Sequence, residues 1–229
     1  MKNKYIILYV LMFLPIVITL LVLPIFPDLI PAHYDAEWNV NRWGSKYEQL
    51  ILPVFTILFG YSMLLIVKRA GKIADTKANE NALIVITSSS VLVFNVLCYV
   101  LLYKAYFTAV GEKEPIKLDL NQLIFMALGI SLCLMGNIMP KFKRNSLAGL
   151  RTKWSMANDT TWFHSQRYGG IALMISGIVI VVANLFITGM GSILSSMAVL
   201  LIDLIVSTII SYQVYKKYSD DSPDKKTIF

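Results

Sequence analysis

The chain has 229 residues, of which 56% are hydrophobic and only 15% are charged. Soluble domains contain about half apolar and about a quarter charged residues, so this composition excludes an ordinary soluble domain and indicates an integral membrane protein. The net charge of +7 does not indicate nucleic-acid binding, because the basic residues of a membrane protein set its orientation in the bilayer. We therefore expect no direct contact with nucleic acid.

Five long uncharged runs follow one another along the sequence. A helix needs about 20 residues to cross a hydrocarbon core about 30 Å thick. The first run exceeds the about 7 to 15 apolar residues of a signal peptide, which favours an uncleaved span. Four of the runs predict single spans, at residues 5–25, 50–67, 82–103 and 122–139.

The fifth run is uncharged over residues 168–202 and, past Asp203, stays apolar to about residue 215, which is too long for a single crossing. Gly189 and Gly191 weaken a helix near the middle of this run and permit a tight turn. A hairpin of two spans is therefore predicted. The expected fold class is an all-α integral membrane protein with six transmembrane helices.

The distribution of basic residues predicts how these spans are oriented. With the N-terminus inside, 16 of the 21 Lys and Arg residues lie on the inner side and 5 on the outer side. Because cytoplasmic loops are enriched in Lys and Arg, both termini are predicted to be cytoplasmic. The two largest loops are then an outer loop at 26–49 and an inner loop at 140–168. The five outer basic residues are Arg42, Lys46, Lys104, Lys113 and Lys117.

The inner loop is basic and aromatic. Pro140 is expected to end the fourth span, and Asn158 or Asp159 can cap a helix that carries Trp162 and Arg167 into the fifth. Composition alone favours a loop that binds anionic lipid headgroups, with its tryptophans at the membrane interface.

The same region contains a long ungapped pattern. The string GN-x-x-PK-x-K-x-N-x-x-x-G-x-RT-x-W is followed by a second Trp and then by R-x-GG. This pattern resembles the signature of the SdpI family of bacterial membrane immunity proteins. The matching residues are Gly136, Asn137, Pro140, Lys141, Lys143, Asn145, Gly149, Arg151, Thr152, Trp154, Trp162, Arg167, Gly169 and Gly170.

Three positions depart from the pattern. Lys153 and Ser155 replace the Pro and the second Thr of the usual T-P-W-T, which we expect to matter little to the fold. Gln166 stands where a His is common, so a titratable group is missing there. His164 lies two residues earlier, and an interfacial side chain without a special task is its preferred interpretation.

The outer loop, IPAHYDAEWNVNRWGSK, carries a second resemblance. It is similar to the short domain of unassigned function that often precedes the SdpI signature, with Asp35, Trp38 and Asn41 in place of the usual Asn, Gly and Asp. Because Trp38 replaces an expected turn glycine, a different loop backbone is predicted. The matching residues are Pro31, His33, Arg42, Gly44, Ser45 and Lys46.

The two resemblances suggest a division of the chain. Residues 1–110 form an N-terminal membrane region with the outer loop 26–49, and residues 111–229 form an SdpI-like membrane region with the inner loop 140–168. The resemblance implies a multi-pass plasma-membrane protein that gives resistance to an antimicrobial peptide or protein toxin. It also implies that a cytoplasmic transcriptional repressor could be held at the inner loop, where a basic surface suits an acidic partner.

Candidate site residues follow from these roles. In an extended segment His33, Asp35 and Glu37 would share one face, and a cationic peptide could bind there. A solvated polar loop is the alternative, and a metal is a weaker interpretation because the spacing is not that of a metal site. No cofactor is predicted. The toxin-binding candidates are His33, Asp35, Glu37, Arg42 and Trp43, and the partner-docking candidates are Lys141, Lys143, Arg151, Trp154 and Arg167.

Asp203 is the one charge well inside a predicted span. Its insertion costs about 2.5 to 3.5 kcal/mol, so the carboxyl group should face protein or water. It is either a protonated group that joins helices or part of a proton or ligand relay. The residues predicted to share its stripe are Ser192, Ser196, Ser207 and Ser211, and the predicted partners are Ser88, Asn95 and Asn184.

The relay interpretation gives the alternative function, a small transporter or channel that uses the Asp203 stripe. An enzyme is disfavoured, because the sequence has no HExxH pair and no nucleophile elbow.

Overall fold

The structure is a computed structural model that describes residues 2–35, 37–70, 79–113, 115 and 119–219. In this part of the chain, six helices are long and apolar enough to cross a membrane. The helices are α1 (Lys2–Val22), α2 (Ile51–Ala70), α3 (Glu80–Val110), α4 (Leu120–Ile138), α5 (Asp159–Ala183) and α6 (Met190–Tyr218). Three short 3-10 helices, η1 (Leu23–Ile25), η2 (Lys46–Leu50) and η4 (Met139–Lys141), adjoin them.

The predicted spans are confirmed, and α3 is longer than predicted. α3 continues to Val110, where Gly111 adopts the left-handed conformation (φ 70°) that ends helices. α5 begins at Asp159, as predicted from the cap at Asn158 or Asp159, and Asn158 and Thr161 form a reciprocal capping box. The turn between α5 and α6 ends at Gly189, which also has a positive φ of 58°.

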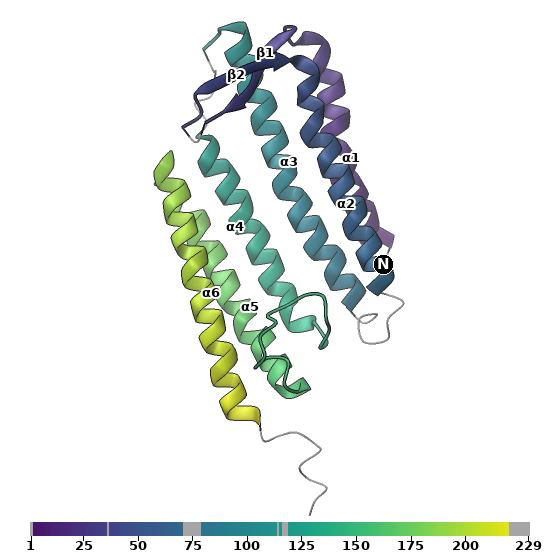
Figure 1. Cartoon of the computed structure of the whole chain (residues 1–229), viewed down its shortest axis with the longest axis vertical. Coiled ribbons are helices and arrows are strands. Elements are labelled where there is room, and N and C mark those ends of the chain that lie inside the picture. The colour runs from purple at the N-terminus through teal and green to yellow at the C-terminus, as the bar shows by residue number, and fades with distance from the viewer. Residues whose placement is uncertain (1, 36, 71–78, 114, 116–118, 220–229) are drawn as a thin grey trace, which may run out of the picture.

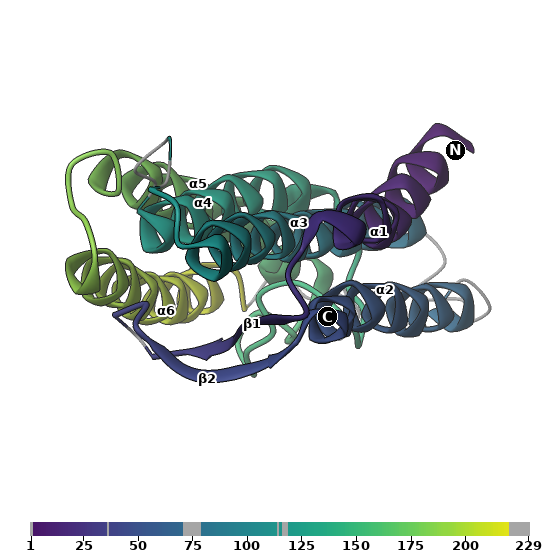
Figure 2. The same ribbon diagram turned by 90° about the horizontal axis from the view of Figure 1, so that it is seen from above.

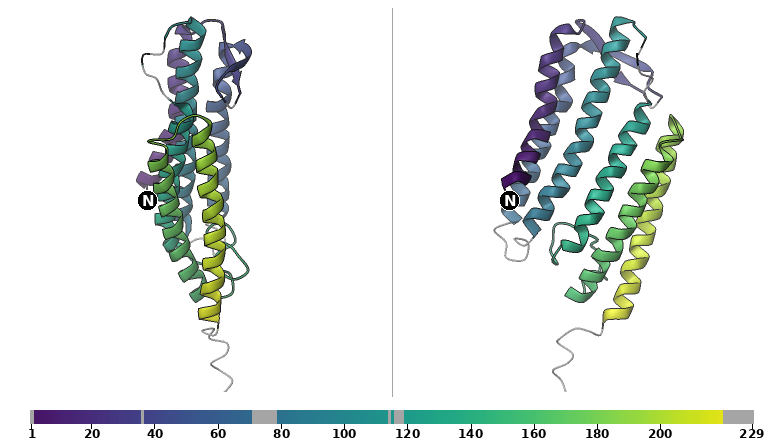
Figure 3. Two further views of the ribbon diagram at one scale, coloured as in Figure 1. Left: turned by 90° about the vertical axis from the view of Figure 1, so that its left-hand side faces the viewer. Right: turned by 180° about the vertical axis from the view of Figure 1, so that it is seen from behind.

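The helices form a flat bundle. Seen from above, α5, α4, α3 and α1 stand in one row, and α6 and α2 lie on the same side of that row at its two ends (Figure 2). Helices that follow one another in the chain run in opposite directions (Figure 1; Figure 3). Both ends of the described chain therefore lie at one end of the bundle, as an even number of crossings requires. Lys117, one of the predicted outer basic residues, lies outside the described residues.

The prediction of an all-α fold needs one correction. The segment between α1 and α2 contains two antiparallel strands, β1 (Leu29–Tyr34) and β2 (Val40–Ser45), so the protein is mostly helical. Leu29 pairs with Ser45, and the register shifts on both sides of His33. We call the end of the bundle that carries these strands the hairpin end, and the end that carries η4 the loop end (Figure 1).

The closest helix contact joins α4 to α5. A Cβ atom built on Gly177 would lie 2.5 Å from the carbonyl oxygen of Gly129, and one on Gly136 would lie 2.5 Å from that of Gly170. The two backbones therefore touch at two places along their length. Small residues that allow such an approach are a main source of helix association in membranes, because lipid tails provide no hydrophobic drive between helices.

This contact predicts a difference between two glycine substitutions. Gly177→Ala should lower the midpoint of thermal unfolding in detergent, because the added methyl group meets the Gly129 backbone and overpacking of this kind costs about 1 to 3 kcal/mol. In the matched variant Gly60→Ala, the three atoms nearest to the methyl group belong to the side chain of Met12, which can change rotamer more easily than a backbone can move. Both changes raise helix propensity equally, so equal midpoints would contradict the close contact.

Candidate functional site

The turn of the hairpin is organised by Asp35. Its Oδ1 accepts hydrogen bonds from the N–H groups of Glu37 and Asn39, both at 2.9 Å, and its Oδ2 accepts one from the Asn39 side chain. The bonds from Asn39 hold the pKa of this carboxyl group below its usual value. The strand ends at Tyr34, so the prediction that His33, Asp35 and Glu37 share one extended face is wrong.

Trp38 is the one non-glycine residue in the described chain with a positive φ, at 64°. The position at which a turn glycine was expected thus has a glycine-like backbone in spite of its large side chain. Bulky residues adopt this conformation only when their surroundings hold them there. The indole Nε1 of Trp38 donates to Asn121 Oδ1 at the start of α4 (2.9 Å). This hydrogen bond helps to keep Trp38 in the positive-φ conformation.

The five predicted toxin-binding residues do not form one cluster. His33 and Arg42 are paired across the strands, but His33 Nδ1 bonds Asn41 Oδ1 (2.7 Å) and Arg42 forms an ion pair with Glu48 (2.6 Å). Trp43 is half exposed on β2. Glu37 lies apart from these residues and lines the pocket described in the next paragraph. In the described part of the chain, no group of three His, Cys, Asp or Glu side chains is placed to hold a metal ion.

Glu37 and Trp38 belong to a pocket of about 230 Å³ at the hairpin end. Four segments meet there: the hairpin turn, the end of α3, the start of α4 and the turn between α5 and α6. Asp119 ties two of them together, because one carboxylate oxygen caps α4 at Gln122 N–H and the other accepts from Gly189 N–H (2.6 Å). The lining residues are Glu37, Trp38, Lys104, Asp119, Leu120, Asn121, Gly189 and Met190.

Sequence reasoning missed this pocket. Asp119 stands directly before an apolar run, which is a helix-cap signal that the sequence does contain. Asn121 gives no such signal, because its role depends on Trp38, which is 83 residues away in the chain.

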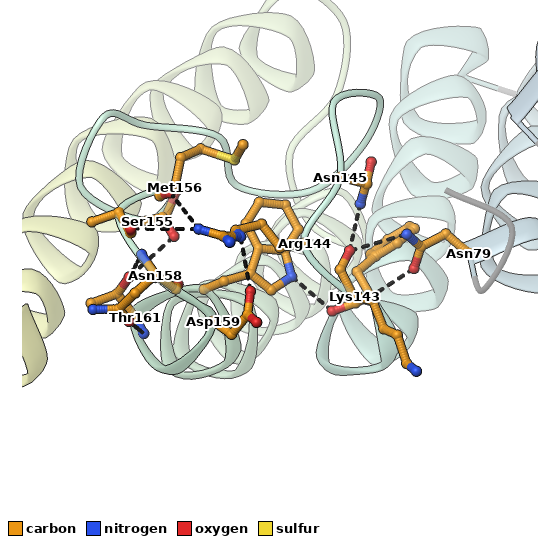
Figure 4. A network of polar contacts seen from close by, with 12 residues as sticks. Asn79, Lys143, Arg144, Asn145, Ser155, Met156, Asn158, Asp159 and Thr161 are labelled. Atoms are coloured by element: carbon orange, nitrogen blue, oxygen red, sulfur yellow. Dashed lines mark hydrogen bonds and ion pairs between the residues drawn. The ribbon is translucent and has the colours of Figure 1, made fainter. Parts of the chain in front are cut away.

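The loop between α4 and α5, residues 139–158, is held by side-chain bonds to its backbone. Asn79, which precedes α3, grips Lys143 by both main-chain groups: Nδ2 donates to the carbonyl (3.0 Å) and Oδ1 accepts from the N–H (2.8 Å) (Figure 4). Asn145 Oδ1 accepts from the N–H groups of Leu147 and Ala148. The loop is therefore an ordered surface that also contacts the N-terminal half of the chain.

Gln166 holds the second half of this loop. Its fully buried side chain accepts from the N–H of Leu150 and donates to the carbonyl of the same residue, both at 2.9 Å. Ser155, also fully buried, donates to the Leu150 carbonyl and accepts from Thr152 N–H. Two of the three departures from the family pattern, Ser155 and Gln166, therefore have a structural role here.

The aromatic residues of the loop differ in position. Trp162 is only 2% exposed and donates from Nε1 to the carbonyl of Phe142 (2.7 Å), so the prediction of an interfacial Trp162 is wrong. Trp154 is half-buried, edge-on to Tyr212 of α6. The imidazole of His164 stacks on Tyr218 with ring centres 4.2 Å apart.

Four predicted docking cations lie exposed on this ordered surface: Lys141, Lys143, Arg151 and Arg167. Arg144, in contrast, is bound to Asp159 (2.8 Å) and donates to the carbonyl of Met156, so it helps to fold the loop (Figure 4). We call the four exposed cations the basic surface.

The partners of the intramembrane polar residues differ from those predicted. Asp203 accepts from Ser176 of α5 (3.0 Å). Asn95 donates to the Leu11 carbonyl of α1 (2.8 Å) and Ser88 to a carbonyl of its own helix, so neither contacts Asp203. The reason is the helix order: α3 packs on α1, α2 and α4, whereas α6 packs on α5 and α4.

One predicted contact of the stripe is present, because Asn184 donates to Ser196 (2.9 Å). Asp203 and Ser176 lie in a groove of about 590 Å³ between the loop-end halves of α5 and α6. The other residues that line the groove are mainly apolar.

Comparisons with known proteins identify two families that match segments of the chain and one similar immunity protein. Residues 141–211 match the SdpI/YfhL protein family, and residues 10–57 match a domain of unknown function, DUF1648. The immunity protein SdpI of Bacillus subtilis strain 168 is 28% identical over 192 residues, which are 82% of this chain and 86% of that protein. No solved structure matches the chain. The predicted resemblance is thereby confirmed: this multi-pass plasma-membrane protein carries the SdpI-family segment, preceded by the domain of unknown function.

Proposed function

We propose that the chain is a membrane immunity protein that protects its cell from an antimicrobial peptide or protein toxin. The observation that carries this proposal is its similarity to an immunity protein over 82% of its length. The role we propose is recognition and signalling rather than catalysis. The division into regions 1–110 and 111–229 stays a prediction.

The hairpin end is proposed to face the outside and the loop end the cytoplasm. This assignment rests on the excess of basic residues on the side of the termini, 16 of 21, and on the positive-inside rule. A toxin that arrives from outside would then first meet the strands and the pocket beside them.

The basic surface at the loop end is proposed to dock an acidic cytoplasmic transcriptional repressor. The loop that carries these cations is held by side-chain hydrogen bonds to its backbone at Lys143, Leu150 and Thr152, which favours recognition of a defined partner. Anionic lipid headgroups are proposed to bind the same cations when no partner is present.

α4 is the proposed connection between the two ends. Its first turn receives the Trp38 hydrogen bond, and its last turn leads into η4 and the 139–158 loop. Because α4 and α5 touch through their backbones, a change at the hairpin end would move both helices together.

A second candidate function is transport through the α5–α6 region. The observation that favours it is the Asp203 carboxyl group in a groove of about 590 Å³, since intramembrane carboxyl groups commonly mark substrate or proton pathways.

Charge reversal on the basic surface tests the docking role. The double variant Arg151→Glu and Arg167→Glu should reduce the transcriptional response to toxin about tenfold, equivalent to about 1.4 kcal/mol, and leave survival under toxin unchanged. RNA profiles and survival counts at matched membrane levels measure the two effects. Lys68→Glu with Arg69→Glu reverses two exposed cations at the same end on α2 and serves as control. Equal loss of response and survival would exclude the separation of roles.

An exchange of the outer hairpin tests recognition. A chain in which residues 28–46 come from the Bacillus subtilis protein should acquire the toxin specificity of that protein, because side chains of this segment are proposed to contact the toxin. Survival of a sensitive host against a panel of peptides measures specificity. Exchange of residues 141–158 should leave specificity unchanged. If the hairpin exchange also leaves it unchanged, recognition lies elsewhere.

Asp203→Ala separates immunity by recognition from immunity by transport. Under the main proposal, cells with this variant keep full resistance, because the carboxyl group of Asp203 joins α6 to Ser176 of α5 and has no part in recognition. Under the transport hypothesis, resistance and solute flux in proteoliposomes are both lost. Ser176→Ala removes only the hydrogen bond to Asp203 and controls for helix packing. Survival and flux are measured with equal amounts of inserted protein.

A further inference from the structure

The pocket at the hairpin end contains a buried hydrogen-bond donor without a partner. The Asn121 side chain is 6% exposed, and its Nδ2 has no hydrogen-bond acceptor among the described residues. The indole N–H of Trp38 can only donate, so Asn121 Oδ1 must face it and Nδ2 must point elsewhere. Leaving such a donor unpaired costs about 1 to 3 kcal/mol, which a ligand that supplies an acceptor would recover.

The charge of the pocket favours a cationic ligand. Its lining contains two carboxylates, Glu37 and Asp119, and one ammonium group, Lys104. Both oxygens of Asp119 are hydrogen-bonded to main-chain N–H groups, and Lys104 already makes an interaction of its own. Glu37 is exposed, and among the described residues only its main-chain N–H is hydrogen-bonded.

Other charges on the hairpin do not compete for a ligand in the same way. Arg42 is paired with Glu48, and Lys46 is paired with Asp28. The carboxylate of Asp35 is occupied by the turn that it stabilises. Glu37 is therefore the acidic group of the hairpin that is best placed to accept a ligand cation.

The remaining walls suit an aliphatic chain. Trp38, Leu120 and Met190 line the pocket with apolar surface. Its volume of about 230 Å³ is below the about 300 to 1,000 Å³ of pockets that hold drug-sized molecules, and leaves room for one amino-acid residue.

We propose that this pocket binds one lysine residue of a cationic peptide. The ammonium group pairs with Glu37 and the aliphatic chain packs on Trp38. Asn121 Nδ2 is covered in the free protein, and a shift of the side chain on binding brings it to the pocket, where it donates to the peptide carbonyl. This inference rests on the proposed function, since it specifies which chemistry of a toxin the outer face recognises. An occupied pocket joins the hairpin turn to α4 and to the α5–α6 turn.

A spectroscopic titration tests the pocket directly. The probe is Nα-acetyl-lysine amide, added to the full chain in lipid nanodiscs with 15N-labelled tryptophan and asparagine. The indole signal of Trp38, assigned with Trp38→Phe, and the side-chain amide signals of Asn121, assigned with Asn121→Asp, should shift together and saturate. Nα-acetyl-norleucine amide, which lacks the ammonium group, should bind at least about tenfold more weakly.

Two matched variants test whether the carboxylate of Glu37 binds the ammonium group of the probe. Glu37→Gln should weaken binding of the lysine probe about tenfold and leave that of the norleucine probe unchanged. Glu112→Gln, at an exposed carboxylate of the same end that does not line the pocket, should change neither. Equal binding of the two probes, no saturable shift with either, or wild-type binding by Glu37→Gln would overturn the proposal.

Survival of a sensitive host separates this inference from the function on which it rests. If the wild-type chain gives no resistance to any peptide or protein toxin of the panel, cationic or not, the immunity proposal fails whatever the titration shows. If the wild-type chain gives resistance and Glu37→Gln retains all of it at equal membrane levels, the pocket is excluded as the recognition site and the immunity function stands.

Discussion

The backbone contact between α4 and α5 is the constraint on which the rest of the structure depends. Gly129, Gly136, Gly170 and Gly177 let two helices meet without side chains between them. The ends of the two helices are therefore fixed relative to each other. At one end this positions the 139–158 loop, and at the other it brings the turn before α6 to the cap of α4 at Asp119. Both candidate sites of the molecule are thus built on one rigid helix pair.

At the loop end, the side chains that hold the loop in place differ from those that form the basic surface. Neutral groups bond the loop backbone, as Asn79 and Gln166 do, whereas the side chains of the basic surface are exposed and make no hydrogen bond or ion pair with the described residues. Arg144 is the exception, because its guanidinium joins Asp159 at the start of α5. This arrangement allows the exposed cations to change during evolution without loss of the fold that presents them.

The sequence predicts the membrane crossings well and the contacts between them poorly. Run lengths and Asn158 identify the spans and the start of α5, because length and capping are local properties. The partners of Asn95 and Asp203 depend on which helices are neighbours, and the sequence carries no local signal for helix order. Trp162 looks interfacial in sequence, but the loop folds back over it. The pocket could not be predicted from the sequence, because it depends on the hydrogen bond between Trp38 and Asn121, which lie 83 residues apart in the chain.

Gln166 has a consequence for the conditions under which such a protein must act. Under the proposed function, a toxin that permeabilises the membrane would also let protons into the cytoplasm. The side chain that clamps Leu150 is an amide, which does not titrate, whereas an imidazole at this position would gain a proton near neutrality. The hydrogen bonds that Gln166 makes to Leu150 therefore persist when the surrounding pH falls, and the part of the loop that they hold keeps its shape.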